Sequence, residues 1–129
     1  MAAQADFWGD IAPVDTRTPV TIMREQAALL GLKTKNVIEA RVDTSVRDSR
    51  IFTDSFCHTL KLVVPALDGY TYALLEVAHG VDPYPADIRY RGQGMTVMNE
   101  ELFSEELKEI LSSPETKRII GNLLVQATQ

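Results

Sequence analysis

Apolar and polar residues alternate with a period of two through the middle of the chain, which is typical of strands with one face in a core. The alternation covers residues 38–46, where even positions are mostly apolar and odd positions mostly polar. Two further segments, residues 52–66 and 70–79, flank Asp68-Gly69, a common turn of β-hairpins. Residues 86–91 can form a fourth short strand at an edge. The pattern therefore predicts an antiparallel sheet.

The register of the predicted hairpin depends on its turn. A two-residue turn would place His58 opposite His79 and Lys61 opposite Glu76. Pro65 opposes this register, because it would fall at a ladder position where its missing N–H matters. A longer loop, or an edge position for this segment, would remove the conflict and shift the pairing. In either case one face is apolar and is expected in the core: Leu60, Leu62, Val64, Ala73, Leu75 and Val77.

Three helices are predicted from capping residues that precede apolar stripes. Thr18-Pro19 starts a helix over residues 19–30, which Gly31 can end in a left-handed conformation. Asn99 caps a second helix, and Ser113 before a proline starts the last one. The order predicts an α+β fold with an N-terminal helix, an antiparallel sheet of about four strands around a central β-hairpin, and two C-terminal helices packed on the sheet.

The chain is expected to divide into an arm and a body. Residues 1–17 are predicted to form an irregular N-terminal arm, and residues 18–129 a single α+β domain of common size. The arm carries Phe7 and Trp8, whose rings are costly to expose. They are expected either to dock on their own domain or to serve as a hook for another chain.

Composition limits the cellular compartment and the classes of partner that we expect. Cys57 is the single cysteine, so no internal disulfide forms and a reducing compartment is expected. We see no signal peptide and no apolar run long enough to span a membrane, so we expect a cytoplasmic protein without a membrane partner. Asp and Glu outnumber Lys and Arg by 18 to 13, and the net charge of −5 makes a nucleic-acid partner unfavourable.

The main candidates for chemistry are His58 and His79, which the two-residue turn would place opposite each other. Two imidazoles could share a divalent metal, or one could act as a general base. Asp54 could serve as a third ligand, whereas Glu76 would point to the opposite face. The alternative is a polar rim where the core face meets solvent. Cys57 points away from His58, because neighbours on a strand alternate, so the two form no thiol–imidazole pair.

A second candidate site consists of Arg41, Arg89 and Arg91, which could bind a phosphate or a nucleic acid. A solvated edge strand that resists pairing with other sheets explains these residues as well. Gly92-Gln93-Gly94 lacks the residues of a phosphate loop and is interpreted as a flexible loop.

The sequence as a whole favours a non-enzymatic protein-binding module, which would be an adaptor, an inhibitor or immunity-type partner, or a small homo-oligomeric protein. The second face of the sheet, which is expected to carry Val63, Tyr72, Leu74 and Ala78, is only partly polar and needs cover from the chain's helices or from another subunit. The candidate partner-binding residues are Phe7, Trp8, Val63, Tyr72 and Leu74. No cofactor is expected. The alternatives are a metal-binding protein or enzyme that uses the two histidines, and nucleotide or nucleic-acid binding through the three arginines.

Overall fold

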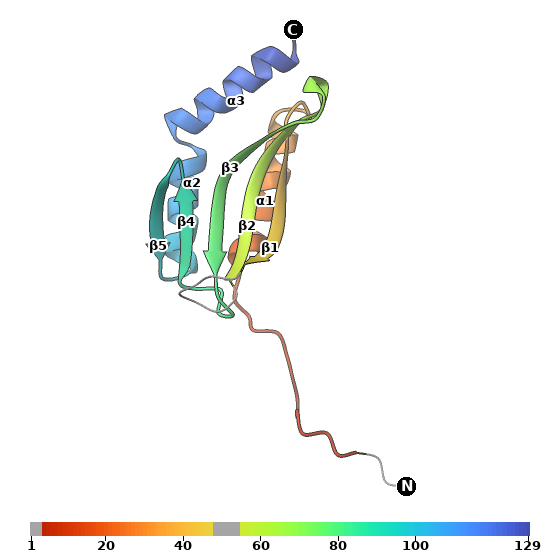
Figure 1. Cartoon of the computed structure of the whole chain (residues 1–129), viewed down its shortest axis with the longest axis vertical. Helices are drawn as coiled ribbons and strands as arrows, with labels where there is room; N and C mark the ends of the chain where they lie inside the picture. The colour runs from red at the N-terminus through yellow and green to blue at the C-terminus, as the bar shows by residue number, and fades with distance from the viewer. Residues whose placement is uncertain (1–3, 48–54) are drawn as a thin grey trace.

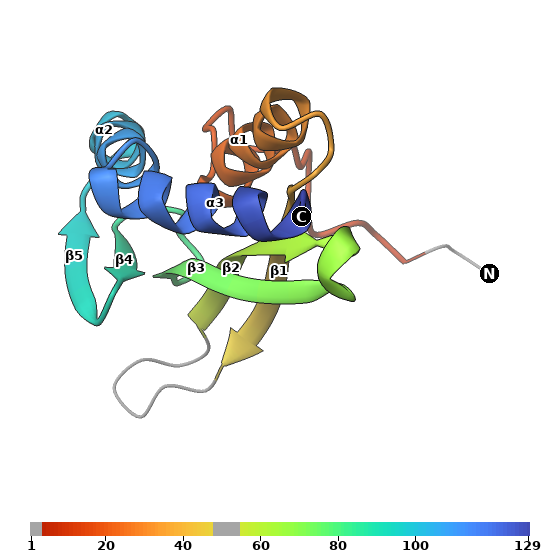
Figure 2. The ribbon, with the colours of Figure 1, turned by 90° about the horizontal axis from the view of Figure 1, so that it is seen from above.

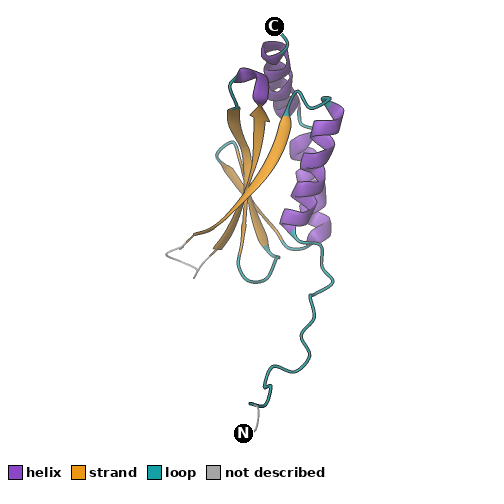
Figure 3. Ribbon diagram, turned by 90° about the vertical axis from the view of Figure 1, so that its right-hand side faces the viewer, coloured by secondary structure: helices purple, strands orange, loops and turns teal. Residues whose placement is uncertain are grey.

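The computed structural model describes residues 4–47 and 55–129. Within these ranges, five strands form one open antiparallel sheet in the order β1-β2-β3-β4-β5, and three helices lie on one of its faces (Figures 1 and 2). We call the opposite face, which no helix of the described residues covers, the open face (Figure 3). The elements are α1 (Pro19–Lys33), β1 (Glu39–Arg47), β2 (Ser55–Val64), η1 (Pro65–Leu67), β3 (Tyr70–His79), β4 (Ala86–Tyr90), β5 (Gln93–Val97), α2 (Glu100–Leu111) and α3 (Pro114–Ala127). The predicted α+β class is confirmed, with one strand more than expected.

The additional strand, β5, begins in the segment that the sequence analysis interprets as a flexible loop. Arg91 and Gly92 have positive φ angles of 54° and 80°, and they form the two-residue turn between β4 and β5. Two successive positive φ angles match the twist of a hairpin, and Asn-Gly or Asp-Gly is the usual sequence. An arginine in the first position hides this signal, because long side chains rarely adopt the left-handed region.

The β2–β3 hairpin has the longer of the two loops considered. Pro65–Leu67 form the short 3₁₀ helix η1, and Asp68 and Gly69 follow with positive φ. The first pair of the hairpin is therefore Val64 with Tyr70. Because the proline lies in the loop, its missing N–H interrupts no ladder of hydrogen bonds.

This loop changes the pairing inside the hairpin. His58 lies opposite Val77, so the predicted direct pairing of His58 with His79 is wrong. The predicted pair of Lys61 with Glu76 is also wrong. The register that a two-residue turn would impose therefore does not occur.

A β-bulge in β3 further changes which side chains share a face. Leu60 pairs with Leu75, but the next residue of β2 pairs with Ala73, which leaves Leu74 as the extra residue. Because side chains alternate along a strand, the bulge exchanges the two faces on its turn side. Leu74 is buried beside Leu75 and Tyr72 packs half-buried against the core, whereas Ala73 is exposed. The prediction that Tyr72 and Leu74 lie on the second face, and Ala73 in the core, is wrong.

The predicted capping residues are confirmed, because the side chain of each accepts a hydrogen bond from the backbone N–H three residues later: Thr18, Asn99 and Ser113. The predicted end of the first helix is wrong. Gly31 stays helical and α1 continues to Lys33, and the positive φ angles fall later, at Lys35 and Asn36. No helix in the described part of the chain is long and apolar enough to cross a membrane.

The core lies between the sheet and the helices. Its largest fully buried side chains come from both layers: Phe103, Met23, Ile38, Leu62, Ile88 and Leu107. On α2 the chain alternates sharply between core and solvent, since Phe103 is fully buried while its neighbour Leu102 is 43% exposed.

Truncating these two neighbours tests the orientation of α2. Phe103→Ala is expected to lower the free energy of unfolding by about 3–5 kcal/mol, because it removes buried area and leaves a cavity. Leu102→Ala is expected to cost less than about 1 kcal/mol, since much of its side chain remains in water. Urea unfolding followed by circular dichroism measures both, and equal losses would show that α2 presents another face to the sheet.

Candidate functional site

A groove of about 730 Å³ lies on the helix side of the sheet, between α1 and the α2–α3 pair. It lies between helices that sit toward opposite edges of the sheet, since α1 packs over β1 and α2 lies beside β5 (Figure 2). Its floor consists of Ala40, Leu60, Leu62 and Leu74. Its apolar walls are Ile22, Ala27, Leu29 and Leu30 of α1, Leu107 and Leu111 of α2, and Ile120 of α3. We call this site the helix groove; it depends on the spacing of the helices, which no residue pattern along the chain reveals.

The rim of the helix groove is basic, although the chain carries a net charge of −5. Lys33, Lys108 and Lys117 line the groove from α1, α2 and α3, and among the described residues none of them forms an ion pair. The acid Glu25 is paired with Arg17. The rim therefore attracts anionic groups, by an amount that salt reduces.

Residues 4–16 form neither helix nor strand and extend away from the body (Figures 1 and 3). Their large apolar side chains lie in solvent: Phe7 is 85% exposed, Trp8 82%, Ile11 75% and Val14 82%. Docking of the Phe-Trp pair on its own domain, one of the two alternatives, is not observed. The arm therefore presents unburied apolar surface.

The arm is fixed where it meets the body. The hydroxyl of Tyr84 donates a hydrogen bond to the carbonyl oxygen of Arg17 at 2.9 Å, and the Arg17 guanidinium pairs with Glu25 on α1. Burial, together with Glu100, raises the pKa of Tyr84 to about 12, so the hydroxyl stays protonated at neutral pH. The backbone and the side chain of Arg17 are thus both held at the point where the helix groove begins.

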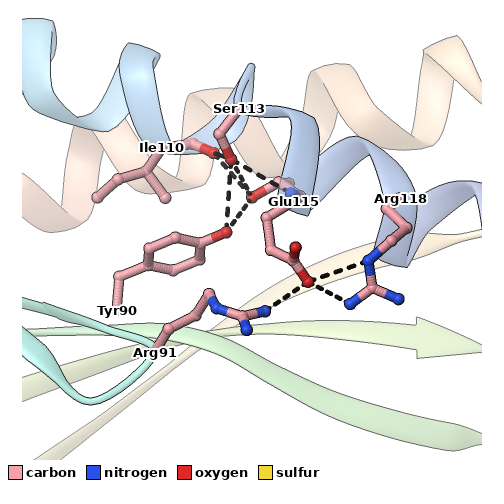
Figure 4. A network of polar contacts seen from close by, with 7 residues as sticks. Tyr90, Arg91, Ile110, Ser113, Glu115 and Arg118 are labelled. Atoms are coloured by element: carbon pink, nitrogen blue, oxygen red, sulfur yellow. Dashed lines mark hydrogen bonds and ion pairs between the residues drawn. The ribbon is translucent and has the colours of Figure 1, made fainter.

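Polar contacts hold α3 against the sheet and α2 (Figure 4). The side-chain oxygen of Thr116 lies 2.8 Å from the Tyr90 hydroxyl and donates to the carbonyl oxygen of Ile110 at 2.7 Å. Glu115 accepts from Arg91 at 2.5 Å and also pairs with Arg118. The two arginines, Arg118 first, lower the pKa of this carboxyl. These contacts fix the end of the helix groove that α3 supplies.

The three arginines considered for phosphate binding do not form one site. Arg41 lies on β1 and pairs with Asp43 at 3.1 Å, while Arg91 lies in the β4–β5 turn and pairs with Glu115. Arg89 lies on β4, in register with Glu76. The structure therefore spreads these positive charges and places an acid near each, which weakens the case for nucleic-acid binding.

The remaining predicted partner-binding residues separate onto two sides of the sheet. Val63 is half-buried on the open face, in register with Glu39 and Thr71. Tyr72 and Leu74 belong to the helix side, and Leu74 forms part of the groove floor. They do not form a common surface with Val63.

His58 and His79 do meet, although diagonally and not as a direct pair. Their Nε2 atoms lie 2.9 Å apart. The Nδ1 of His79 must carry a hydrogen, because it lies 2.8 Å from the carbonyl oxygen of Gly80, which can only accept. In the neutral pair His58 therefore donates from Nε2 to His79 and accepts at Nδ1 from the hydroxyl of Thr44, at 2.9 Å. The result is a hydrogen-bonded chain of fixed direction.

This geometry favours a hydrogen-bonded pair over a metal centre. Two nitrogens that bind one zinc ion at about 2.0–2.1 Å lie roughly 3.3 Å apart in a tetrahedral site, and the observed separation is that of a hydrogen bond. Among residues 4–47 and 55–129, no three His, Cys, Asp or Glu side chains cluster as a metal site would require. Asp54, the third ligand considered, lies outside the described residues.

Cys57 is buried on the open face, in register with Ser45 and Ala78. Burial raises the pKa of the thiol, and Glu76 raises it further. A thiol held in its protonated form is a poor nucleophile. Cys57 is thus a small buried side chain that fills space within the sheet.

The histidine pair makes stability depend on pH. Burial, then His79 and Arg24, lower the pKa of His58 from 6.5 to about 4. The unfolded chain therefore binds a proton that the folded chain does not, and stability present above pH 6.5 is lost as the pH falls toward 4. Between these two pH values we expect the free energy of unfolding to fall by close to about 1.4 kcal/mol for each pH unit lost.

The measurement is urea unfolding between pH 4 and 7 on the unchanged chain and on His58→Gln. The carboxyl groups titrate in both chains, so the difference between the two curves isolates the histidine. Parallel curves would show that His58 is not held neutral in the folded protein.

Comparisons of the chain with protein families, curated proteins and solved structures find no match to any of them. The geometry of the helix groove, the arm and the histidine pair is therefore the ground on which a function is proposed.

Proposed function

We propose that this chain is a protein-binding module whose helix groove holds an extended peptide segment with apolar and acidic side chains. The observation that carries the proposal is the apolar floor of the groove beneath three lysines without ion-pair partners among the described residues. The single cysteine is buried and free, which supports a reducing compartment such as the cytoplasm.

The lining favours a peptide over a small polar substrate. The floor is formed by aliphatic side chains, so it offers no donor or acceptor to orient a substrate. The lining, all within the described residues, contains no histidine or cysteine, and its single carboxylate, Glu25, is engaged by Arg17. Walls from three helices over a sheet floor suit apolar anchors of a peptide.

Affinity would come from a few anchors. Each large aliphatic or aromatic side chain that leaves water for the floor contributes about 1.5–3 kcal/mol, and part of this gain is lost in ordering the peptide. Acidic side chains of the peptide would lie near Lys33, Lys108 and Lys117 and add electrostatic attraction. A dissociation constant of about micromolar order is expected for two or three anchors.

Two exposed leucines of α1 give a matched test of the groove. Leu29 is 47% exposed and lines the groove, whereas Leu32 is 73% exposed and does not. Peptides selected from a random library on the unchanged chain are expected to combine apolar and acidic residues. Leu29→Asp should weaken them at least about tenfold, while Leu32→Asp should leave affinity unchanged. Equal losses in both variants would contradict the groove as the site.

The lysines test the charge of the ligand. Lys108→Glu combined with Lys117→Glu should weaken the selected peptides about tenfold and reduce the salt dependence of binding. The control is Lys35→Glu, which reverses an exposed charge outside the groove lining. Fluorescence anisotropy at two salt concentrations measures both, and selected peptides without acidic residues would contradict the proposal.

A further inference from the structure

We propose that the occupant of the helix groove is the arm, residues 4–16, of a second copy of this chain. This inference rests on the proposed function and names the ligand of the same site. Two copies would exchange arms, and each arm would lie in the groove of the other copy.

The arm has the chemistry that the groove requires. Residues 4–16 of the arm carry four exposed apolar side chains, and the charged side chains in this range are all acidic: Asp6, Asp10 and Asp15. Arg17, which follows them, is paired with Glu25. The groove has an apolar floor, and the charges on its rim that form no ion pair within residues 4–47 and 55–129 are the three lysines. Arm and groove are thus complementary in both polarity and charge, in a chain whose overall charge is negative.

The arm is also long enough. Thirteen residues in extended conformation span up to about 43 Å, whereas the 15 residues of α1, which form one wall of the groove, span about 22 Å. Residues 4–16 can therefore cover the full length of the groove and still bridge the gap between two copies.

The anchoring of Arg17 favours the groove of another copy over the chain's own. Its carbonyl oxygen is held by Tyr84, its guanidinium by Glu25, and the next residue, Thr18, caps α1. From this point the arm runs away from the helices (Figures 1 and 3). Docking on the same body would require a reversal of the backbone directly beside these contacts, whereas docking on a second copy requires none.

Reciprocal exchange closes the assembly. Each copy supplies one arm and one groove, so two copies related by a two-fold axis satisfy both sites and leave none open for further addition. The second arm then binds within a complex that the first has already formed, which strengthens the pair.

Trp8 is the only tryptophan, so its fluorescence reports on the arm alone. At high concentration we expect a light-scattering mass of about twice 14.4 kDa and a Trp8 emission shifted to shorter wavelength, with both reverting on dilution. Leu29→Asp should be monomeric with the emission of a solvated tryptophan. Leu32→Asp should behave as the unchanged chain.

Mixing two variants identifies the partner. Trp8→Ala has an intact groove and no tryptophan, and Leu29→Asp has an intact arm. We expect each to be monomeric alone, and the emission of Leu29→Asp to shift to shorter wavelength when Trp8→Ala is added. A Trp8→Ala chain that also carries Leu29→Asp should cause no shift, because its groove is altered.

Three results would overturn the inference. The first is a short-wavelength Trp8 emission that does not change with concentration, which indicates docking on the same chain. The others are a dimer that Leu29→Asp leaves intact, and an emission of Leu29→Asp that does not shift when Trp8→Ala is added. The proposed function is judged separately, by the affinity of selected peptides for a Phe7→Ala/Trp8→Ala chain. If those peptides bind while the unchanged chain is monomeric with a solvated Trp8, the groove is a peptide site and only the arm exchange is wrong.

Discussion

The need to cover the apolar face of a five-stranded sheet with three helices determines most of this structure. Removing that face from water provides the main driving force for packing α1 and α2 on the sheet. The two helices lie toward opposite edges, over β1 and beside β5, and α3 runs from α2 toward η1. The helix groove lies between these helices, over the middle strands. The side chains of Leu60, Leu62 and Leu74 at its floor are only 1–5% exposed, so most of the accessible apolar surface of the groove comes from its helical walls.

The bulge at Leu74 decides which side chains of β3 form the floor of the helix groove. Without the extra residue, strict alternation would turn Leu74 and Tyr72 to the open face, as the sequence pattern predicts. With it, two successive residues, Leu74 and Leu75, both contribute to the helix side. A simple period of two cannot reveal a bulge, because the apolar side chains on both sides of Leu74 fit either register. The composition of the groove floor therefore lay beyond sequence reasoning, although the strands themselves did not.

Local chemistry made other elements predictable. The three helix starts follow from Thr18, Asn99 and Ser113, whose side chains cap backbone N–H groups and whose effect depends on neighbours in sequence. The turn at Arg91 is local as well, but an arginine in the left-handed region hides it. The meeting of the two histidines depends instead on pairing between distant residues. Sequence reasoning placed the histidines near each other for a register that does not occur; the actual register brings them together diagonally. The residue type identified His58 and His79 as candidates for chemistry. The distance between their Nε2 atoms then favours a hydrogen-bonded pair over a metal site.

The open face differs in charge from the arm and the helix groove. On the open face, charged side chains pair with one another, as in Lys61 with Asp43 and Arg47 with Glu76, so this face is polar and locally neutral. Charges along β1 also discourage pairing with another sheet. The arm and the helix groove instead keep apolar surface beside charge of a single sign. Exposed apolar side chains in the arm add nothing to the packing of their own body, and the proposed exchange gives them a contact with a second copy.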